Sequence, residues 1–77
     1  MTNTNALRQK IAESGLKIKF IAQKMNITYQ GLLNKIDNKT EFTASEIVAL
    51  CKILNLSNRE RDAIFFAKKV DLESIAK

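Results

Sequence analysis

One short stretch of the chain, FIAQKMNITYQGLLNKI at residues 20–36, constrains the fold more than any other. Apolar residues recur in it at spacings of three and four, the period of one helix face, and the pattern breaks once, between Asn26 and Thr28. Asparagine tolerates a positive φ better than any residue except glycine, so we expect a tight reversal at Asn26. The stretch therefore predicts two short helices joined by a turn, with Thr28 capping the second helix.

The rest of the chain predicts three further helices. Residues 6–14 repeat apolar side chains at helical spacing, and Gly15 follows as the residue that ends a helix in a left-handed turn. Two capping boxes, TASE at 43–46 and SNRE at 57–60, each predict the start of another helix. No alternating run of useful length predicts a strand, apart from a weak one around FFAKKV. The predicted class is all-α with five helices.

The length of the chain bounds its organisation. Seventy-seven residues with 45% hydrophobic content predict one domain over 1–77, with a core at about 5–67 and a C-terminal tail at 68–77. No stretch reaches the roughly 18 apolar residues that a membrane helix needs, and the N-terminus lacks the apolar segment of a signal peptide. We therefore expect a cytoplasmic protein without membrane contact.

The residue types exclude most catalytic and metal-binding chemistry. The chain has no histidine and a single cysteine, Cys51, whose setting IVALCKIL is that of a small buried hydrophobe. A zinc site and a Ser-His or Cys-His catalytic group therefore lack their parts. Carboxylates such as Glu13 and Asp37 have no evident partner for general acid and base work. We expect no enzyme, metal, cofactor or small-molecule substrate.

The positive charge of the chain is uneven. Residues 1–40 hold seven lysines and arginines against two acidic residues, whereas residues 41–77 hold six of each, so the whole net charge of +5 lies in the first half. A basic half beside a neutral one predicts a face that binds a polyanion. A scattered, solvated surface would give the same sum, and that alternative stays open.

A helix-turn-helix needs a small residue where its helices cross, a left-handed residue in the turn, and apolar residues that lock the helices together. Ala22 and Asn26 meet the first two demands, and Ile21, Met25, Ile27 and Leu32 meet the third. At these residues the chain resembles the Cro and C-repressor class of phage regulators, whose pattern runs Gln-x3-Ala-x3-Gly-Ile-Ser before a recognition helix. The resemblance covers about residues 5–67, and LLNKI, EFTASEIVAL and IFFAKKVD resemble small Cro-like phage proteins.

This resemblance implies a five-helix lambda-repressor-like DNA-binding domain with the helix-turn-helix at helices 2 and 3, acting in a bacterial host cell. The chain departs from the family pattern at three positions. Ile18 stands where the family often has a glutamine that braces the recognition helix, and Asn26 replaces the usual glycine. Lys35 stands at a commonly apolar position, with Ile36 taking its place in the core.

The expected recognition helix, at about 29–36, would enter the major groove of DNA with its N-terminal side chains at the base edges. Gln30 has the amide geometry to bond adenine, Tyr29 can pack on a thymine methyl or bond a phosphate, and Asn34, one turn onward, reaches a neighbouring base. All three have a plainer alternative as ordinary exposed residues. The residues expected at the DNA backbone are Lys17, Lys19, Thr28, Gly31, Lys35, Lys39 and Thr40. A glycine inside a helix costs up to about 1 kcal/mol relative to alanine, and close approach of DNA is one reason for Gly31.

The predicted function is sequence-specific binding of double-stranded DNA as a transcriptional regulator. One monomer reads only a few base pairs, so we expect a homodimer through the fifth helix and the C-terminal tail, where Val70, Leu72 and Ile75 exceed the needs of the core. Phe65 and Phe66 belong either to the core or to that interface. The alternative function is a helical protein-interaction module, such as an anti-repressor or assembly factor, which would not bind DNA.

Overall fold

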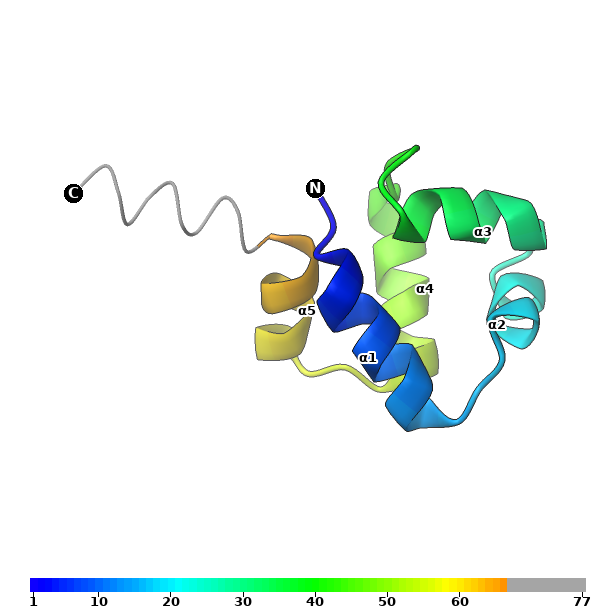
Figure 1. Cartoon of the computed structure of the whole chain (residues 1–77). Coiled ribbons are helices and arrows are strands. Elements are labelled where there is room, and N and C mark those ends of the chain that lie inside the picture. Colours follow the sequence, from blue (N-terminus) through cyan, green and yellow to red (C-terminus); the bar gives the residue numbers. More distant parts are fainter. Residues whose placement is uncertain (67–77) are drawn as a thin grey trace.

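Helices account for most of the residues that the structure describes. The computed structural model describes residues 1–66, and residues 67–77, which include the whole predicted tail, lie outside the described part. The helices are α1 Thr4–Ser14, α2 Ile18–Lys24, α3 Tyr29–Ile36, α4 Ala44–Leu54 and α5 Asn58–Phe65, and no strand occurs within residues 1–66 (Figure 1). The predicted all-α class with five helices is confirmed for these residues.

Side-chain hydrogen bonds start the helices close to their predicted positions. The Thr43 hydroxyl accepts a hydrogen bond from the Glu46 N–H at 3.2 Å, and the Glu46 carboxylate accepts one from the Thr43 N–H at 2.8 Å. The box at 57–60 forms the same reciprocal pair. Helix α1 starts at Thr4 rather than at residue 6, because the Asn3 side chain accepts a hydrogen bond from the first turn. Each cap satisfies a backbone donor that the helix itself leaves free.

Residues in the left-handed region connect the helices. Gly15 ends α1 with φ 74°, and Asn26, Asn38 and Asn55 have φ values of 60°, 65° and 55°. Asparagine visits this region more readily than other residues with a side chain, so the turns carry little strain. The left-handed turns expected at Gly15 and Asn26 are confirmed, whereas that at Asn38 was not foreseen.

One hydrophobic core joins all five helices. Its buried members are Leu7 and Ile11 of α1, Ile21 and Ala22 of α2, Leu32 and Ile36 of α3, Leu50 of α4, and Ile64 and Phe65 of α5. The Phe65 ring meets the Phe42 ring edge to face, with centroids 5.5 Å apart and planes at 84°. Phe66, in contrast, is 41% exposed. The two neighbouring phenylalanines therefore have different surroundings, with Phe65 in the core and Phe66 at the surface.

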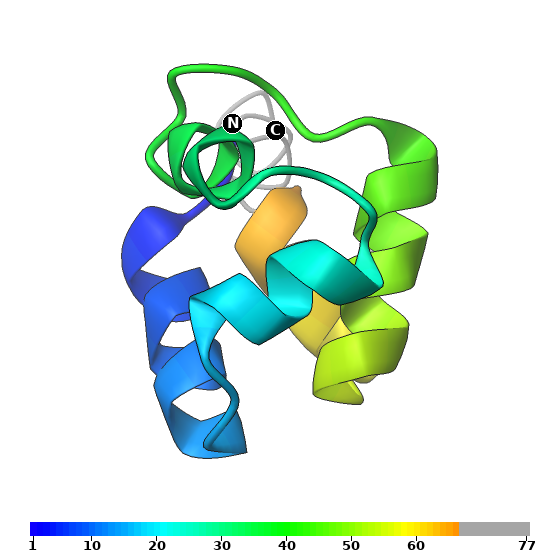
Figure 2. The same cartoon turned by 90° about the vertical axis from the view of Figure 1, so that its right-hand side faces the viewer.

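Helices α2 and α3 form one end of the described structure, while α5 and the N-terminus lie toward the other end (Figure 1). Helix α3 packs against α2 and α1, and α2 also contacts α4. Seen from that end, α3 runs almost along the line of sight above α2, and α1 and α4 flank the pair (Figure 2). This placement buries one side of α3 and leaves its other side to solvent.

Candidate nucleic-acid interface

The turn between α2 and α3 is built as the sequence predicts. Ala22 is 2% exposed in the middle of α2, where its small side chain lets the neighbouring helices approach. Its carbonyl accepts a hydrogen bond from the Ile27 N–H at 3.0 Å, which closes the turn around Asn26. Leu32 of α3 is fully buried on the far side of this turn. Two short helices therefore meet through residues 25–28 with apolar contacts on both sides.

Thr28 and Gly31 form a tight N-terminal cap on α3. The Thr28 hydroxyl accepts a hydrogen bond from the Gly31 N–H at 2.9 Å. A Cβ atom added at Gly31 would lie 2.8 Å from the Thr28 Oγ1, closer than real Cβ contacts come. The glycine therefore has a local cause, the close cap, which accounts for it without the nearby DNA backbone that the sequence suggested.

The solvent side of α3 carries the three residues expected to contact bases. Tyr29 is 50% exposed, Gln30 is exposed and Asn34 is half-buried. The Gln30 Nε2 donates a hydrogen bond to the Asn34 Oδ1 at 3.0 Å, one helical turn further on. Ile36, on the opposite side, is fully buried. The structure thus brings the expected base-reading side chains together on one polar face.

The loop after α3 folds back onto the end of that helix. The Asn34 carbonyl accepts hydrogen bonds from the N–H groups of Lys39 and Thr40, at 2.8 and 3.3 Å. Both side chains are exposed. Because their backbone is tied to Asn34, these two residues are held beside the polar face of α3.

Lys35 was expected to contact the DNA backbone, but its ammonium group is bound by other residues of the protein. Its Nζ lies 3.0 Å from the Glu46 Oε1 and donates a hydrogen bond to the Glu41 carbonyl at 3.1 Å. Its side chain is 17% exposed. Burial raises the pKa of Glu46, but the Thr43 N–H and Lys35 outweigh that effect and hold the pKa below its ordinary value. Lys35 is thus committed to joining α3 to α4 and is poorly placed to reach a phosphate.

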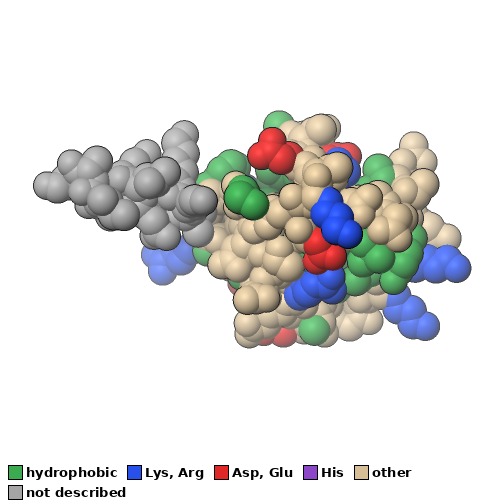
Figure 3. Space-filling view, turned by 45° about the horizontal axis from the view of Figure 1, so that its top comes forward, with side chains coloured by type: hydrophobic (Ala, Val, Ile, Leu, Met, Phe, Trp, Pro, Cys, Tyr) green, Lys and Arg blue, Asp and Glu red, His purple; other side chains and the backbone are tan. Residues whose placement is uncertain are grey.

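Ion pairs neutralise most acidic residues within residues 1–66 but involve only some of the lysines and arginines. Five of the six carboxylates in residues 1–66 lie within ion-pair distance of Arg8, Lys10, Lys35 or Arg61, and the exception is Glu41. Four lysines in or beside α2 and α3 make no ion pair within residues 1–66, namely Lys17, Lys19, Lys24 and Lys39. Lysine and arginine side chains protrude at this end of the molecule (Figure 3). Four of the six lysines and arginines that make no ion pair within residues 1–66 therefore lie beside α2 and α3.

The start of α2 carries positive charge but has no polar side chain that holds α3 in place. Lys17 occupies the N-cap position of α2 and makes no side-chain capping bond. Ile18 is half-buried and packs against the core. Its side chain has no polar group, so it cannot brace α3 by a hydrogen bond as a glutamine would.

Sequence reasoning missed Lys24, whose Nζ lies 5.6 Å from the centre of the exposed Phe20 ring. Their four-residue spacing on a helix was the available signal for this cation–π contact.

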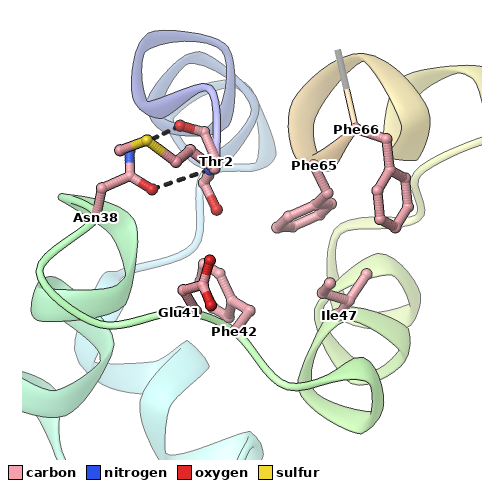
Figure 4. A pocket seen from close by; sticks show the side chains of 8 residues that line it. Thr2, Asn38, Glu41, Phe42, Ile47, Phe65 and Phe66 are labelled. Atoms are coloured by element: carbon pink, nitrogen blue, oxygen red, sulfur yellow. Dashed lines mark hydrogen bonds between the residues drawn. The ribbon is translucent and has the colours of Figure 1, made fainter. Parts of the chain in front are cut away.

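A second exposed feature combines apolar side chains with a few polar ones. A groove of about 300 Å³ is lined by the N-terminus, the loop after α3, and the ends of α4 and α5, including Phe42, Ile47 and Phe66 (Figure 4). A neighbouring hollow is lined by Ala44, Ile47, Val48, Arg61 and Phe66. Val48 is 54% exposed. An exposed apolar surface therefore lies at α4 and α5 and does not include α3.

Comparisons with protein-family models, with curated proteins and with solved structures gave no match to this chain. Within the described residues, no three histidine, cysteine or carboxylate side chains come together as a metal site would require. Among the helices of that same part, none has the length and apolar character needed to cross a membrane.

Proposed function

We propose that this chain binds double-stranded DNA sequence-specifically, as a transcriptional regulator similar to phage Cro and C-repressor proteins. In this proposal α2, the turn at 25–28 and α3 act as a helix-turn-helix, and α3 enters the major groove. The observation that carries the proposal is the division of α3 between its buried apolar side and its exposed amide-bearing side, flanked by the four lysines Lys17, Lys19, Lys24 and Lys39, which make no ion pair within residues 1–66. That combination supplies both base-reading groups and phosphate-binding charge.

Base recognition would rest on the two amides of α3. The side-chain amide of a glutamine or an asparagine can form two hydrogen bonds with adenine, one at N6 and one at N7 of the base. Because Gln30 and Asn34 are hydrogen-bonded at 3.0 Å, each amide limits the rotation of the other. Tyr29, 50% exposed at the start of α3, is available to pack on a thymine methyl. The pair therefore presents a partly ordered set of donors and acceptors to neighbouring bases.

Phosphate contacts would come from both sides of α3. Lys17 and Lys19 lie at the start of α2, and Lys39 and Thr40 lie in the loop after α3. All four side chains are exposed. Contacts of this kind position a protein on the duplex and make its affinity depend on salt.

We further propose that two copies bind together, because repressors of this motif read half-sites about 34 Å apart. The exposed Val48 and Phe66, with Ala44 and Ile47, supply an apolar surface for this contact at α4 and α5. The residues expected to extend the interface, Val70, Leu72 and Ile75, lie outside the described residues. The same apolar surface is what favours the second candidate function, a module that binds another protein instead of DNA.

A binding experiment separates these candidates. Duplexes selected from a random pool by the full chain would be titrated by fluorescence anisotropy, beside a random duplex of equal length. Gln30→Ala should lose about 1–3 kcal/mol on the selected site and little on the random duplex. Gln9 is a matched control, because it is exposed on α1 and bonds Glu13 one turn onward at 3.1 Å.

The two glutamine variants should differ in their binding to the selected duplex. Gln9→Ala should bind both duplexes like the unaltered chain. Equal losses on the selected and random duplexes for Gln30→Ala would refute its reading role. A full chain that binds no duplex with salt-dependent affinity would leave the protein-interaction module as the better function.

A further inference from the structure

Residues near the N-terminus are tied to the loop after α3 by a set of hydrogen bonds. The Thr2 N–H donates to the Asn38 Oδ1 at 2.9 Å, and the Asn38 Nδ2 donates to the Thr2 carbonyl at 2.8 Å (Figure 4). The same Nδ2 lies 3.2 Å from the Thr4 Oγ1. The Thr4 hydroxyl in turn donates to the Ile36 carbonyl at 2.6 Å. We call Thr2, Thr4 and Asn38 the N-terminal bracket.

The bracket holds the C-terminal end of α3. The last carbonyls of a helix have no partner within the helix, and Thr4 supplies one to Ile36 at the final residue of α3. Asn38 fits this role through its backbone as well, because its φ of 65° turns the chain away from the helix. The predicted core began at about residue 5, so these contacts from residues 2 and 4 extend the fold beyond it.

The two ends of α3 are therefore held by different parts of the chain. Its N-terminal end is held by the Thr28 cap and the turn from α2, and its C-terminal end by the bracket. A helix of eight residues is roughly 12 Å long, so a pivot of about 5° about one end moves the other by roughly 1 Å. Base-edge hydrogen bonds tolerate only a few tenths of an ångström around their usual lengths.

The bracket is also joined to the opposite side of the molecule. The backbone N–H of Asn3, between the two bracket threonines, donates to the Ile64 carbonyl of α5 at 2.6 Å. Asn3 also caps α1 through its side chain. The segment that holds α3 is thus anchored to α1 and α5, which makes it a fixed support for the recognition helix.

We propose that Asn38 and Thr4 are positioning residues, which set the orientation of α3 and thereby the discrimination between DNA sequences. Both act through the end of α3 and lie apart from the exposed amides of Gln30 and Asn34. The proposal rests on the proposed function, because it assumes that α3 reads bases. Loss of the bracket should lower selectivity more than it lowers general affinity for DNA, which phosphate contacts elsewhere sustain.

The chain offers a matched pair of substitutions. Asn38→Gly keeps a residue suited to positive φ but removes three hydrogen bonds of the side chain. Asn55→Gly makes the same backbone change at φ 55°, after α4, where the asparagine side chain makes no hydrogen bond to the described residues. Thr4→Val removes the hydroxyl from the Ile36 carbonyl at nearly constant volume, and Thr4→Ser retains a hydroxyl.

Anisotropy titrations would measure affinity for a selected duplex and a random one, at a temperature where urea titration shows every variant folded. For Asn38→Gly and Thr4→Val, the ratio of specific to random affinity should fall about tenfold, the equivalent of one lost base contact. Asn55→Gly and Thr4→Ser should keep the ratio of the unaltered chain. An unchanged ratio in folded Asn38→Gly and Thr4→Val would overturn the proposal.

A measurement without DNA keeps this test independent of the proposed function. Amide chemical shifts of the full chain should change at Gln30 to Leu33 in Asn38→Gly, beyond the substituted loop, and should stay in place there in Asn55→Gly. If no duplex is selected but these shifts change, DNA reading fails while the positioning of α3 stands. If the shifts at Gln30 to Leu33 stay unchanged, the bracket does not orient α3 and the proposal is wrong.

Discussion

Salt dependence of DNA binding offers a direct test of which lysines face the duplex. Lys35 and Lys39 lie four residues apart, at and beyond the end of α3, yet the structure gives them different surroundings. Lys39 is exposed and makes no ion pair within residues 1–66, whereas the Lys35 Nζ lies 3.0 Å from Glu46 with 17% of its side chain exposed. Replacing each with alanine should therefore affect binding differently.

The expected magnitude follows from counting phosphates. Each neutralised phosphate contributes about 0.9 to the slope of log affinity against log salt. With Lys17, Lys19 and Lys39 each meeting one phosphate in each of two bound copies, the slope should be about −5.4. Lys39→Ala removes one contact per copy and should bring the slope to about −3.6. Lys35→Ala should leave it near its original value.

The assay is an anisotropy titration on the selected duplex between about 50 and 200 mM salt, the range in which such slopes are resolved. The fraction of the slope lost with Lys39, about one third, is the same whether one or two copies bind. Lys52→Ala, at an exposed lysine of α4, serves as a further control. If Lys35→Ala reduces the slope as much as Lys39→Ala does, the ion pair with Glu46 does not keep Lys35 from the DNA phosphates, and the assignment of phosphate contacts is wrong.

Three further predictions concern stability and assembly. Thr28→Ala removes the cap of α3 and should lower the free energy of unfolding by about 1 kcal/mol in a urea titration; no change would refute the cap. Hydrogen bonds from Lys10 and from the Ser57 N–H lower the pKa of Glu60 from 4.5 to about 2. The ionised carboxylate therefore stabilises the fold above pH 4.5, and this contribution is lost as the pH falls from 4.5 toward 2. In Glu60→Gln the acid-induced drop of the urea midpoint should be smaller, and an identical drop would contradict the pair. Val48→Asp, at a 54% exposed position, should give a monomer in sedimentation velocity, unlike Ala12→Asp on the exposed side of α1.

The parts of the fold that depend only on residues close together in the sequence could be predicted from the sequence. Thr28, Thr43 and Ser57 each bond a backbone N–H three residues later, so their roles need no knowledge of the rest of the molecule. Asn26 adopts positive φ for a reason contained in its own side chain. The exposed side of α3 followed from the period of its apolar residues, with Leu32 and Ile36 buried opposite it.

The candidate site was less predictable where it depends on residues from elsewhere in the chain. The charge of Lys35 pointed to a phosphate contact, but Glu46 on α4 takes up its ammonium group. Gly31 was interpreted through DNA proximity, while the distance to the Thr28 hydroxyl supplies a local cause. Neither Phe65 nor Phe66 could be placed from sequence, because helical spacing does not say which of two adjacent rings meets Phe42.

The sequence by itself determined where the helices start and turn, which faces are apolar, and that the net positive charge belongs to the first half of the chain. These properties arise from bonds over three or four residues and from composition, both of which are independent of tertiary packing. Only the tertiary structure decided which lysines within residues 1–66 form ion pairs and how the end of α3 is held. Thr2 and Asn38 are 36 positions apart, and contacts of that range exist only once the core has brought α1, α3 and α5 together.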